Sequence, residues 1–344
     1  MHIVYLVTSE KDQQCGVVDY TRQLAHAISD GKTKVTIEEL PSWSLNALIR
    51  LRDKYKNGDS IVFHLQYPTL GMGKSFAPAL LHFASKSNKI FITFHEFEQF
   101  SLIRKSYFIF SSLLNTSFIF TNEYEQEQFA SFFPWAKKKS VIIPIGNNIS
   151  AIPFQKKIDA PQHRLIYFGQ IAPNKGIEEY LETVCCLRAA KNHLPCAIIG
   201  GLVTPSSELA QKVQTMAEKY NIECLFNLSS EDVSQELHKS SMAYLPFPSG
   251  VGDKRGSALA CLKHDLGVIT KHSEHTPQWW TESTHHGENA QHAAVIIQAI
   301  SSGEINKVPV PSALKQAMDD REWCNIARVH TEVYTMVGNT CLLK

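Results

Sequence analysis

The chain has 344 residues, of which 44% are hydrophobic. One hydrophobic core rarely serves so long a chain, so we expect two domains of roughly 150 to 170 residues each. Lys and Arg number 34 while Asp and Glu number 33, and this balance removes any global argument for a nucleic-acid partner or an acidic partner.

The cysteine pattern and the first ten residues indicate in which cellular compartment the protein works. The eight cysteines include no C-x-x-C pair, and several lie in apolar surroundings, where a reduced thiol packs as a small hydrophobe. We therefore predict a reducing cytoplasm, with a disulfide framework as the alternative. The opening MHIVYLVTSE has no basic residues before its apolar run and no small-residue cleavage site after it. It predicts a first strand rather than a signal peptide.

The first half of the chain alternates buried strands with helical segments, a pattern typical of a parallel sheet. Strands are predicted at residues 3–7, 34–40, 60–65, 90–94, 118–121 and 140–144. Polar or special residues follow four of these strands, at positions 64–67, 95–96, 122–123 and 146–148. Open parallel sheets bind ligands at the carboxyl ends of their strands, so these positions predict one cleft.

A loop near the N-terminus, QCGVVDY at residues 14–20, brings a glycine to a strand-to-helix turn. Backbone can approach a ligand closely at Gly16 because the residue has no Cβ. The motif lacks the G-x-G-x-x-G pattern, so an ordinary structural turn is the alternative.

The second half repeats the α/β pattern after a break. Residues 148–164 contain two prolines and mixed charge, as is typical of an interdomain linker. Strands at 165–168, 196–200 and 223–226 then alternate with helices at 177–191, 207–220 and 231–239. We predict domains at 1–150 and 164–310, and a C-terminal helix within 311–344 that could return to the first domain.

The stretch from Tyr244 to Thr270, YLPFPSGVGDKRGSALACLKHDLGVIT, predicts a strand, a Pro- and Gly-rich loop, a helix of small residues and a second strand. Lys254 and Arg255 stand beside a helix start at Gly256. Two cations beside unpaired amides and the positive end of a helix dipole favour a phosphate or diphosphate. A solvated loop before an ordinary helix is the alternative.

Five segments resemble the GT-B glycosyltransferases, and among them the large retaining family 4. They are CGVVDYTRQLA, FHE at 94–96, IIPIGNNI at 142–149, YFGQIAPNKGIEEYLE at 167–182, and PFPSGVGDKRGSALACLKHDLGVIT at 246–270. The resemblance implies an α/β fold of GT-B type, in which two Rossmann-like domains face each other across a cleft. It implies that the second domain holds a nucleotide-sugar donor and the first mostly the acceptor.

The resemblance also implies roles for individual residues. Lys175 matches the family's lysine that contacts the donor diphosphate, and His95 matches a histidine that contacts the donor sugar. Gly16, with Val17 beside it, matches a glycine loop near the phosphates. Gly256, Ser257 and Ala258 match the helix start that holds the diphosphate through backbone N–H groups.

Two departures from the family pattern change the expected site. Gln170 follows Gly169 where the family usually has an arginine, and no pair of glutamates separated by seven residues occurs near residues 252–260. Arg255 and Lys254 could supply the missing positive charge from another direction. Asp253 is a candidate for a sugar or ribose contact. We therefore expect His95, Lys175 and Arg255 to be catalytic.

The activity that the resemblance implies is transfer of a hexose from a nucleotide diphosphate sugar to an acceptor hydroxyl, with retention of configuration and no metal or other cofactor. The acceptor would be a saccharide or a lipid-linked saccharide, in glycan or surface-polysaccharide assembly. The departures leave an alternative: a weak or inactive GT-B protein that binds a nucleotide sugar or a partner transferase. A dinucleotide-dependent oxidoreductase is disfavoured, because neither half contains G-x-G-x-x-G.

Two further patterns leave alternatives open. Arg104 and Lys105 lie beside aromatic residues 107–110, and basic residues 137–139 follow aromatic residues 132–135. They could dock the inner face of a membrane, or belong to an ordinary helix with solvated lysines. The same charges argue against a spanning helix at 100–120. Histidines at 272, 275, 285 and 286 lack the i, i+4 spacing of a helical zinc pair, so a metal site is disfavoured.

Overall fold

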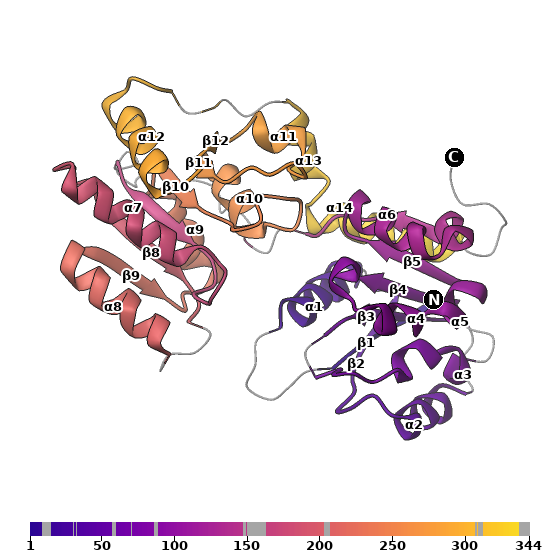
Figure 1. Cartoon of the computed structure of the whole chain (residues 1–344). Helices are drawn as coiled ribbons and strands as arrows, with labels where there is room; N and C mark the ends of the chain where they lie inside the picture. The colour runs from indigo at the N-terminus through magenta and orange to yellow at the C-terminus, as the bar shows by residue number, and fades with distance from the viewer. Residues whose placement is uncertain are drawn as a thin grey trace. The chain divides into compact units, whose positions relative to one another are not determined.

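The computed structural model describes residues 1–8, 15–29, 31, 33–56, 60–69, 71–85, 89–146, 149, 163–202, 207–306, 308 and 312–336. The chain forms two compact units, one from Met1–Gly146 with Asp320–Lys344 and the other from Asn147–Asp319. Each unit contains one six-stranded sheet with helices around it (Figure 1), which confirms the α/β class predicted from the sequence. The predicted linker, residues 148–164, lies outside the described residues except at 149, 163 and 164.

The first unit is built on a parallel sheet with strand order β2-β1-β3-β4-β5-β6. Its strands are β1 (His2–Val7), β2 (Lys34–Glu39), β3 (Ile61–Tyr67), β4 (Lys89–Phe94), β5 (Thr116–Phe120) and β6 (Ser140–Ile142). The four central strands are buried along almost their whole length, as expected when helices cover both faces of a parallel sheet. All six predicted strands of this half are therefore confirmed.

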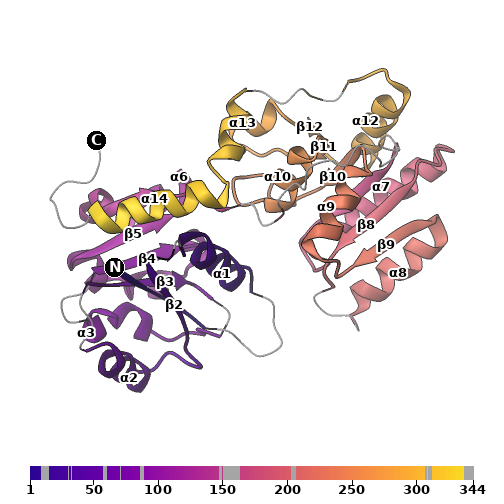
Figure 2. The same cartoon turned by 180° about the vertical axis from the view of Figure 1, so that it is seen from behind.

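The helices of the first unit lie on the two faces of this sheet. They are α1 (Gly16–Ile28), α2 (Leu45–Tyr55), α3 (His82–Ser85), α4 (Leu102–Ser106), α5 (Ile109–Leu113), α6 (Glu123–Phe132) and α14 (Trp323–Met336), with the 3₁₀ turns η1 (Ala77–Leu80), η2 (Phe97–Gln99) and η3 (Pro134–Lys139). One face is covered by α1 together with α14, the yellow C-terminal helix in Figure 2. The other face packs a large aromatic core against the remaining helices.

The second unit repeats the architecture with strand order β12-β11-β10-β7-β8-β9, again all parallel. Its strands are β7 (Leu165–Phe168), β8 (Cys196–Gly200), β9 (Ile222–Phe226), β10 (Met242–Leu245), β11 (Gly267–Thr270) and β12 (His285–His286). Its helices are α7 (Ile177–Ala189), α8 (Glu208–Tyr220), α9 (Ser230–His238), α10 (Gly256–Lys263), α11 (Gln278–Thr281), α12 (Ala290–Ser302) and α13 (Ser312–Asp319).

One strand was not predicted from the sequence, and one apolar window agrees with its prediction. Residues 285 and 286, expected in a loop, form the two-residue edge strand β12, which is too short to show a sequence pattern of its own. The apolar window 100–120 splits into two short helices, α4 and α5, and the strand β5. Among the described residues, no helix is long and apolar enough to cross a bilayer.

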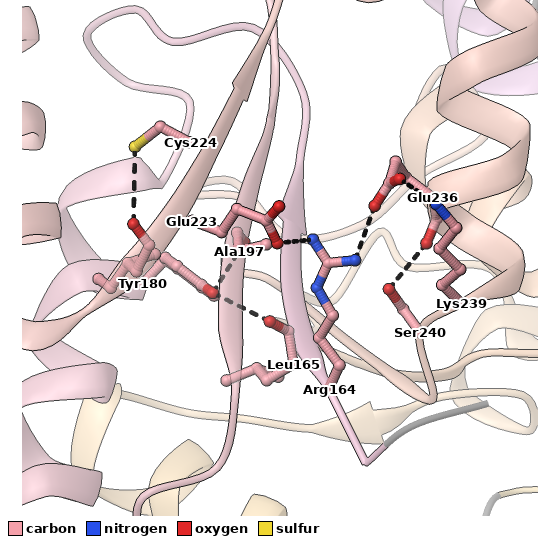
Figure 3. Close-up of polar contacts among 10 residues, drawn as sticks. Arg164, Leu165, Tyr180, Ala197, Glu223, Cys224, Glu236, Lys239 and Ser240 are labelled. Atoms are coloured by element: carbon pink, nitrogen blue, oxygen red, sulfur yellow. Dashed lines mark hydrogen bonds and ion pairs between the residues drawn. The ribbon is translucent and has the colours of Figure 1, made fainter. Parts of the chain in front are cut away.

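A buried guanidinium braces the start of the second sheet (Figure 3). Arg164 immediately precedes β7, and its side chain pairs with Glu223 on β9 at 2.6 Å and with Glu236 on α9 at 2.7 Å. Burial tends to raise the pKa of Glu236, but hydrogen bonds from Lys239 and Arg164 outweigh it and lower that pKa below its ordinary value. The Arg164 carbonyl oxygen also accepts from the amides of Ser241 and Met242. One residue thus ties a strand, a helix and a turn together.

Replacing Arg164 should destabilise this unit. Arg164→Met removes one of the two cations that pair with the partly buried Glu236, and we expect the free energy of unfolding to fall by about 2 to 4 kcal/mol. Glu223→Gln is the matched control, because Glu223 is largely exposed and an exposed pair contributes under about 1 kcal/mol. Urea unfolding followed by tryptophan fluorescence measures both. Equal losses in the two variants would contradict a bracing role for the buried contact.

Candidate functional site

In the first unit, His95 lies directly after β4 and is almost completely buried. Its backbone amide donates to the carbonyl of Tyr67 at the end of β3, at 2.9 Å. Its ring lies edge-on to Tyr20 of α1, with centroids 5.3 Å apart. The end of β4 and the first turns of α1 therefore meet around this histidine, at the carboxyl edge of the sheet.

Behind His95 runs a chain of buried hydrogen bonds. His95 Nε2 lies 2.9 Å from Gln66 Oε1, and Gln66 Nε2 lies 3.2 Å from His64 Nε2. His64 Nδ1 lies 2.5 Å from the hydroxyl of Tyr334 on α14, which is 3.0 Å from the hydroxyl of Tyr5. The interior of β3 thus carries two polar side chains, His64 and Gln66, that are fully buried and hydrogen-bonded, as buried polar groups require.

The predicted glycine site is placed next to this histidine. Gly16 begins α1, with Val17 as the following residue. Among the described residues outside its chain neighbours and its own helix backbone, no atom lies within 4 Å of where a Cβ on Gly16 would stand. Tyr20, one turn further on, contacts both His95 and Trp323 of α14. The six residues before Cys15, and the pair at 147–148 in the predicted GNN segment, lie outside the described residues.

In the second unit, the loop from Gly169 to Gly176 lies between the ends of β7 and β10. The Tyr167 hydroxyl donates to the carbonyls of Gln170 at 3.1 Å and Lys175 at 3.0 Å, so one side chain fixes both ends of the loop. Gly176 has φ +90°, and a Cβ there would stand 2.2 Å from the carbonyl oxygen of Pro246. Only glycine fits this close approach.

Arg255 lies on the neighbouring loop, after β10. Its guanidinium stacks over the ring of Phe247, 4.6 Å from the centroid. Burial lowers the pKa of Arg255, and the nearby Tyr167 acts against this shift. Burial also raises the pKa of Tyr167, and the Arg255 charge opposes that. The structure therefore brings Arg255, Gln170 and Lys175 to one place, around the Tyr167 side chain.

Neither of these two cations is neutralised within the part of the chain that the structure describes. The ion pairs and side-chain hydrogen bonds of the described residues include none from the Lys175 ammonium or the Arg255 guanidinium. A partly buried cation without a carboxylate partner is costly, and such groups gather at anion sites. This pair of residues is the strongest functional signal in the second unit.

The start of α10 differs in one respect from what the sequence predicted. The amides of Gly256 and Ala258 already donate to the carbonyls of Lys254 and Arg255, at 3.2 and 3.0 Å. The tight turn at Asp253 and Lys254 supplies these acceptors. Gly256 and Ala258 are thus partly satisfied, so binding of a diphosphate by Gly256, Ser257 and Ala258 stays a prediction that requires these amides to be shared or released.

Sequence reasoning placed Gln66 among the polar residues at a strand end and Tyr167 in a family-like segment, but it did not predict that they hold the other candidate residues in place. A tyrosine or glutamine within an apolar strand is an ordinary core residue by pattern alone, and only the strand ends gave a signal. Among the described residues, no three His, Cys, Asp or Glu side chains are grouped so that they could hold a metal ion.

Comparison with known proteins gives different results for sequence and structure. No protein-family model matches the sequence, and no curated protein matches it. A glycosyltransferase from Rickettsia africae ESF-5 has a similar structure over 98% of this chain and 99% of its own, with a TM-score of 0.74 at 12% identity. Anabaena Alr3699/HepE, solved in complex with UDP, covers 97% of this chain and 100% of its own, with a TM-score of 0.73 at 12% identity.

A third structure extends this comparison. The pneumococcal O-GlcNAc transferase GtfA, in complex with UDP and GlcNAc, matches 86% of this chain and 60% of its own, with a TM-score of 0.61 at 13% identity. At such low identity these likenesses establish the fold. The chain has the GT-B glycosyltransferase fold, with two six-stranded parallel sheets flanked by helices, which confirms the fold class expected from the sequence.

The buried histidines next to the candidate site predict acid sensitivity. Burial lowers the pKa of His330, on α14, to about 4, against a weaker raising effect of its hydrogen bond to Ile326. Burial, together with neighbouring His330 and His95, holds the pKa of His64 well below its ordinary value. Because the unfolded chain binds these protons first, stability is complete above about pH 6.5 and falls as the pH drops toward 4.

For His330 the loss should amount to about 3 kcal/mol, since one pKa unit corresponds to about 1.4 kcal/mol. His330→Leu should remove this part of the slope and keep stability at neutral pH, because Nε2 of His330 finds no hydrogen-bond partner among the described residues. Urea unfolding across this pH range measures the slope. His26→Leu, at an exposed position of α1, is the control. An unchanged slope in His330→Leu would show that this histidine does not titrate as stated.

Proposed function

We propose that this protein is a glycosyltransferase that uses a UDP-sugar donor, of the retaining family 4 type. The observation that carries the proposal is a pair of cations, Lys175 and Arg255, on the loops after β7 and β10 of a GT-B fold, with no carboxylate partner among the described residues. Structural neighbours solved with UDP or UDP-glucose support uridine as the nucleoside. The diphosphate is the part of such a donor that these cations suit.

The chemistry follows from the charge that develops during transfer. As the bond between the anomeric carbon and the diphosphate oxygen breaks, the sugar becomes oxocarbenium-like and the departing UDP gains negative charge. The Arg255 guanidinium, stacked on Phe247 before the reaction, and the Lys175 ammonium, carried on a loop that Tyr167 fixes, stabilise that charge. Arg255 is suited to bridge two phosphate oxygens because its guanidinium is planar and fixed on Phe247. No metal ion is needed in this scheme.

His95 is assigned to the sugar. Its buried ring, held between Gln66 and Tyr20, would orient the hexose through its ring or its backbone carbonyl. A phosphate oxygen of the donor takes the proton of the acceptor hydroxyl on the face from which the diphosphate departs, so configuration is retained. We further propose Gly16, Val17, Gly169, Gln170, Asp253, Lys254 and the α10 start as contacts to the donor. The acceptor is a saccharide or a lipid-linked saccharide, in glycan or surface-polysaccharide assembly.

A second candidate function is donor binding without turnover. Gln170 is exposed and neutral where the family has an arginine, and residues 252–260 contain no glutamate to hold the ribose or sugar hydroxyls. A protein with these changes could bind a nucleotide sugar, or a partner transferase, without transferring the sugar. Transfer or hydrolysis of a bound donor separates this candidate from the first.

Donor binding is the first test. Thermal shift and calorimetry with UDP-glucose, UDP-GlcNAc, GDP-mannose and ADP-glucose should give a stabilising shift with a UDP-sugar. Lys175→Ala and Arg255→Ala should each weaken its affinity about 10-fold to 100-fold, the usual effect of losing one hydrogen bond to a charged group. Lys212→Ala is the matched control, an exposed lysine of the same unit that pairs with Glu178.

The outcomes distinguish the two candidates. Donor binding that is lost in the two variants and kept in Lys212→Ala, followed by sugar transfer or slow donor hydrolysis with the anomer assigned by NMR, supports a retaining transferase. Binding without any turnover supports the second candidate. Two results overturn the donor site proposed here. One is the absence of a thermal shift with any nucleotide sugar, and the other is that Lys175→Ala and Arg255→Ala bind the donor as tightly as the unchanged protein.

A further inference from the structure

Two consecutive helices of the first unit bury polar side chains and expose apolar ones. The α5 helix buries Ser111 and Ser112, whereas Phe110 and Leu113 are 63% and 62% exposed. Ser111 Oγ donates inward to the carbonyl of Ala79 at 3.0 Å, so the serines are held on the protein side by hydrogen bonds. A helix on a soluble protein normally presents the opposite faces.

The preceding helix, α4, shows the same inversion. Leu102 and Ile103 are both 70% exposed, while Lys105 is buried. The Lys105 ammonium lies over the rings of Phe97 and Phe132, 5.1 and 4.5 Å from their centroids. The usual arrangement is the reverse, with the lysine in solvent and the aliphatic side chains buried. The helix has a polar residue that it could expose, yet it exposes Leu102 and Ile103 instead.

Exposed apolar side chains lie on α3, α4, α5 and η3, and contacts link these elements to one another. We call this region the basic-apolar surface: Phe83, Leu102, Ile103, Phe110, Leu113 and Trp135. Trp135 Nε1 donates to Ser112 Oγ at 3.2 Å, which joins η3 to α5. The hydrogen bond from Ser111 joins α5 to η1, which is followed in the chain by α3 with Phe83. The ring of Phe76, just before η1, contacts Tyr107 between α4 and α5.

Charge identifies what this surface fits. Residues 71–85, 100–115 and 132–139, which build it, contain six Lys and Arg and no Asp or Glu, although the whole chain has a net charge of only +1. Lys137 and Lys138 are exposed beside Trp135. A second copy of the chain would bring like charges together. Exposed aromatic and aliphatic side chains bordered by cations fit an anionic bilayer surface. The apolar side chains insert into the interface, and the cations contact the lipid headgroups.

We propose that the basic-apolar surface of α3, α4, α5 and η3 docks the protein on an anionic lipid bilayer. Leu102, Ile103, Phe110 and Leu113 enter the interface, and lysines 137–139 lie at headgroup level. The proposal requires neither the donor site nor catalytic turnover.

Vesicle co-sedimentation of the full chain tests it. Vesicles of phosphatidylcholine with phosphatidylglycerol should bind the protein, and vesicles of phosphatidylcholine alone should bind it much less. The double variant Phe110→Ser with Leu113→Ser should weaken binding about tenfold or more, and the double variant Lys137→Glu with Lys138→Glu should weaken it mainly at low salt. Val295→Ser is the matched control, because Val295 on α12 is 61% exposed but lies outside this surface.

Four results would overturn the proposal. The protein fails to bind anionic vesicles, or the Phe110→Ser with Leu113→Ser variant binds them as well as the unchanged protein. Val295→Ser loses as much binding as that variant, or the protein binds soluble polyglutamate as tightly as it binds the vesicles. The last would identify an acidic polymer as the partner. Sedimentation velocity adds a fifth arm, because self-association that disappears in the α5 variant would assign the surface to a second copy. Circular dichroism checks that each variant is folded, which is expected since all substituted side chains are exposed.

A second inference comes from the hydrogen-bonded chain behind His95, and it rests on the role proposed for His95. Thr93 Oγ1 lies 2.7 Å from His64 Nε2, the same atom that Gln66 Nε2 approaches. His64 Nε2 therefore accepts, so the proton of a neutral His64 is on Nδ1 and is donated to the Tyr334 hydroxyl. With its amide nitrogen directed at His64, Gln66 offers its oxygen to His95.

We infer that Gln66 is a positioning residue that fixes His95 in the tautomer protonated at Nε2, and that α14 anchors it through Tyr334 and His64. The ring orientation of His95 and the protonation of its two ring nitrogens then depend on α14, a helix more than two hundred residues away in sequence.

NMR of ¹⁵N-labelled histidines tests this without any activity. The His95 signal, assigned by its loss in His95→Gln, should report Nε2–H, and in Gln66→Leu it should become a mixture of tautomers. Gln66→Leu should also lower kcat/KM about tenfold or more through misplacement of the ring. An unchanged His95 signal in Gln66→Leu overturns the positioning role. A changed signal with unchanged donor handling overturns the sugar role of His95 instead.

Discussion

The chemistry of this chain depends on one geometric constraint, which is that all strands in each sheet are parallel. Parallel strands place their carboxyl ends at a single edge, so residues far apart in sequence meet there without any direct attraction between them. His95 meets Tyr20 of α1 in this way in the first unit, and in the second unit Tyr167 lies near Arg255 and bonds the backbone carbonyl of Lys175. Each sheet is buried on both faces, which leaves its edges as the sites where polar groups remain available.

Much of this arrangement could be predicted from the sequence, because strand ends are marked by polar residues after apolar runs. Apart from the two-residue β12, the strands of both sheets follow from that pattern, and so do the positions of His95, Lys175 and Arg255 after them. What could not be predicted is the support behind them. Tyr167 and Gln66 look like core residues in a linear pattern, and their roles arise only when the neighbouring strand or loop supplies carbonyls and amides for them to hold.

The inverted helices were hidden from the sequence for a related reason. In the segment around α4 and α5, apolar residues dominate, so a periodic pattern cannot tell which face is buried. Tertiary partners decide it: a carbonyl on η1 takes the serine hydroxyl and two aromatic rings take the lysine. The sequence showed the basic residues of this region, but the burial of Lys105 and the exposure of the aliphatic side chains beside it required the structure.

The position of α14 has a consequence for biosynthesis. This helix completes the first unit, yet the ribosome makes it after the whole second unit. Until residue 336 has emerged, the face of the first sheet that carries Tyr5 and His64 lacks half of its helical cover. The second unit can fold while the first is still incomplete, so nascent chains expose an apolar face for most of translation and depend on chaperones or on fast elongation.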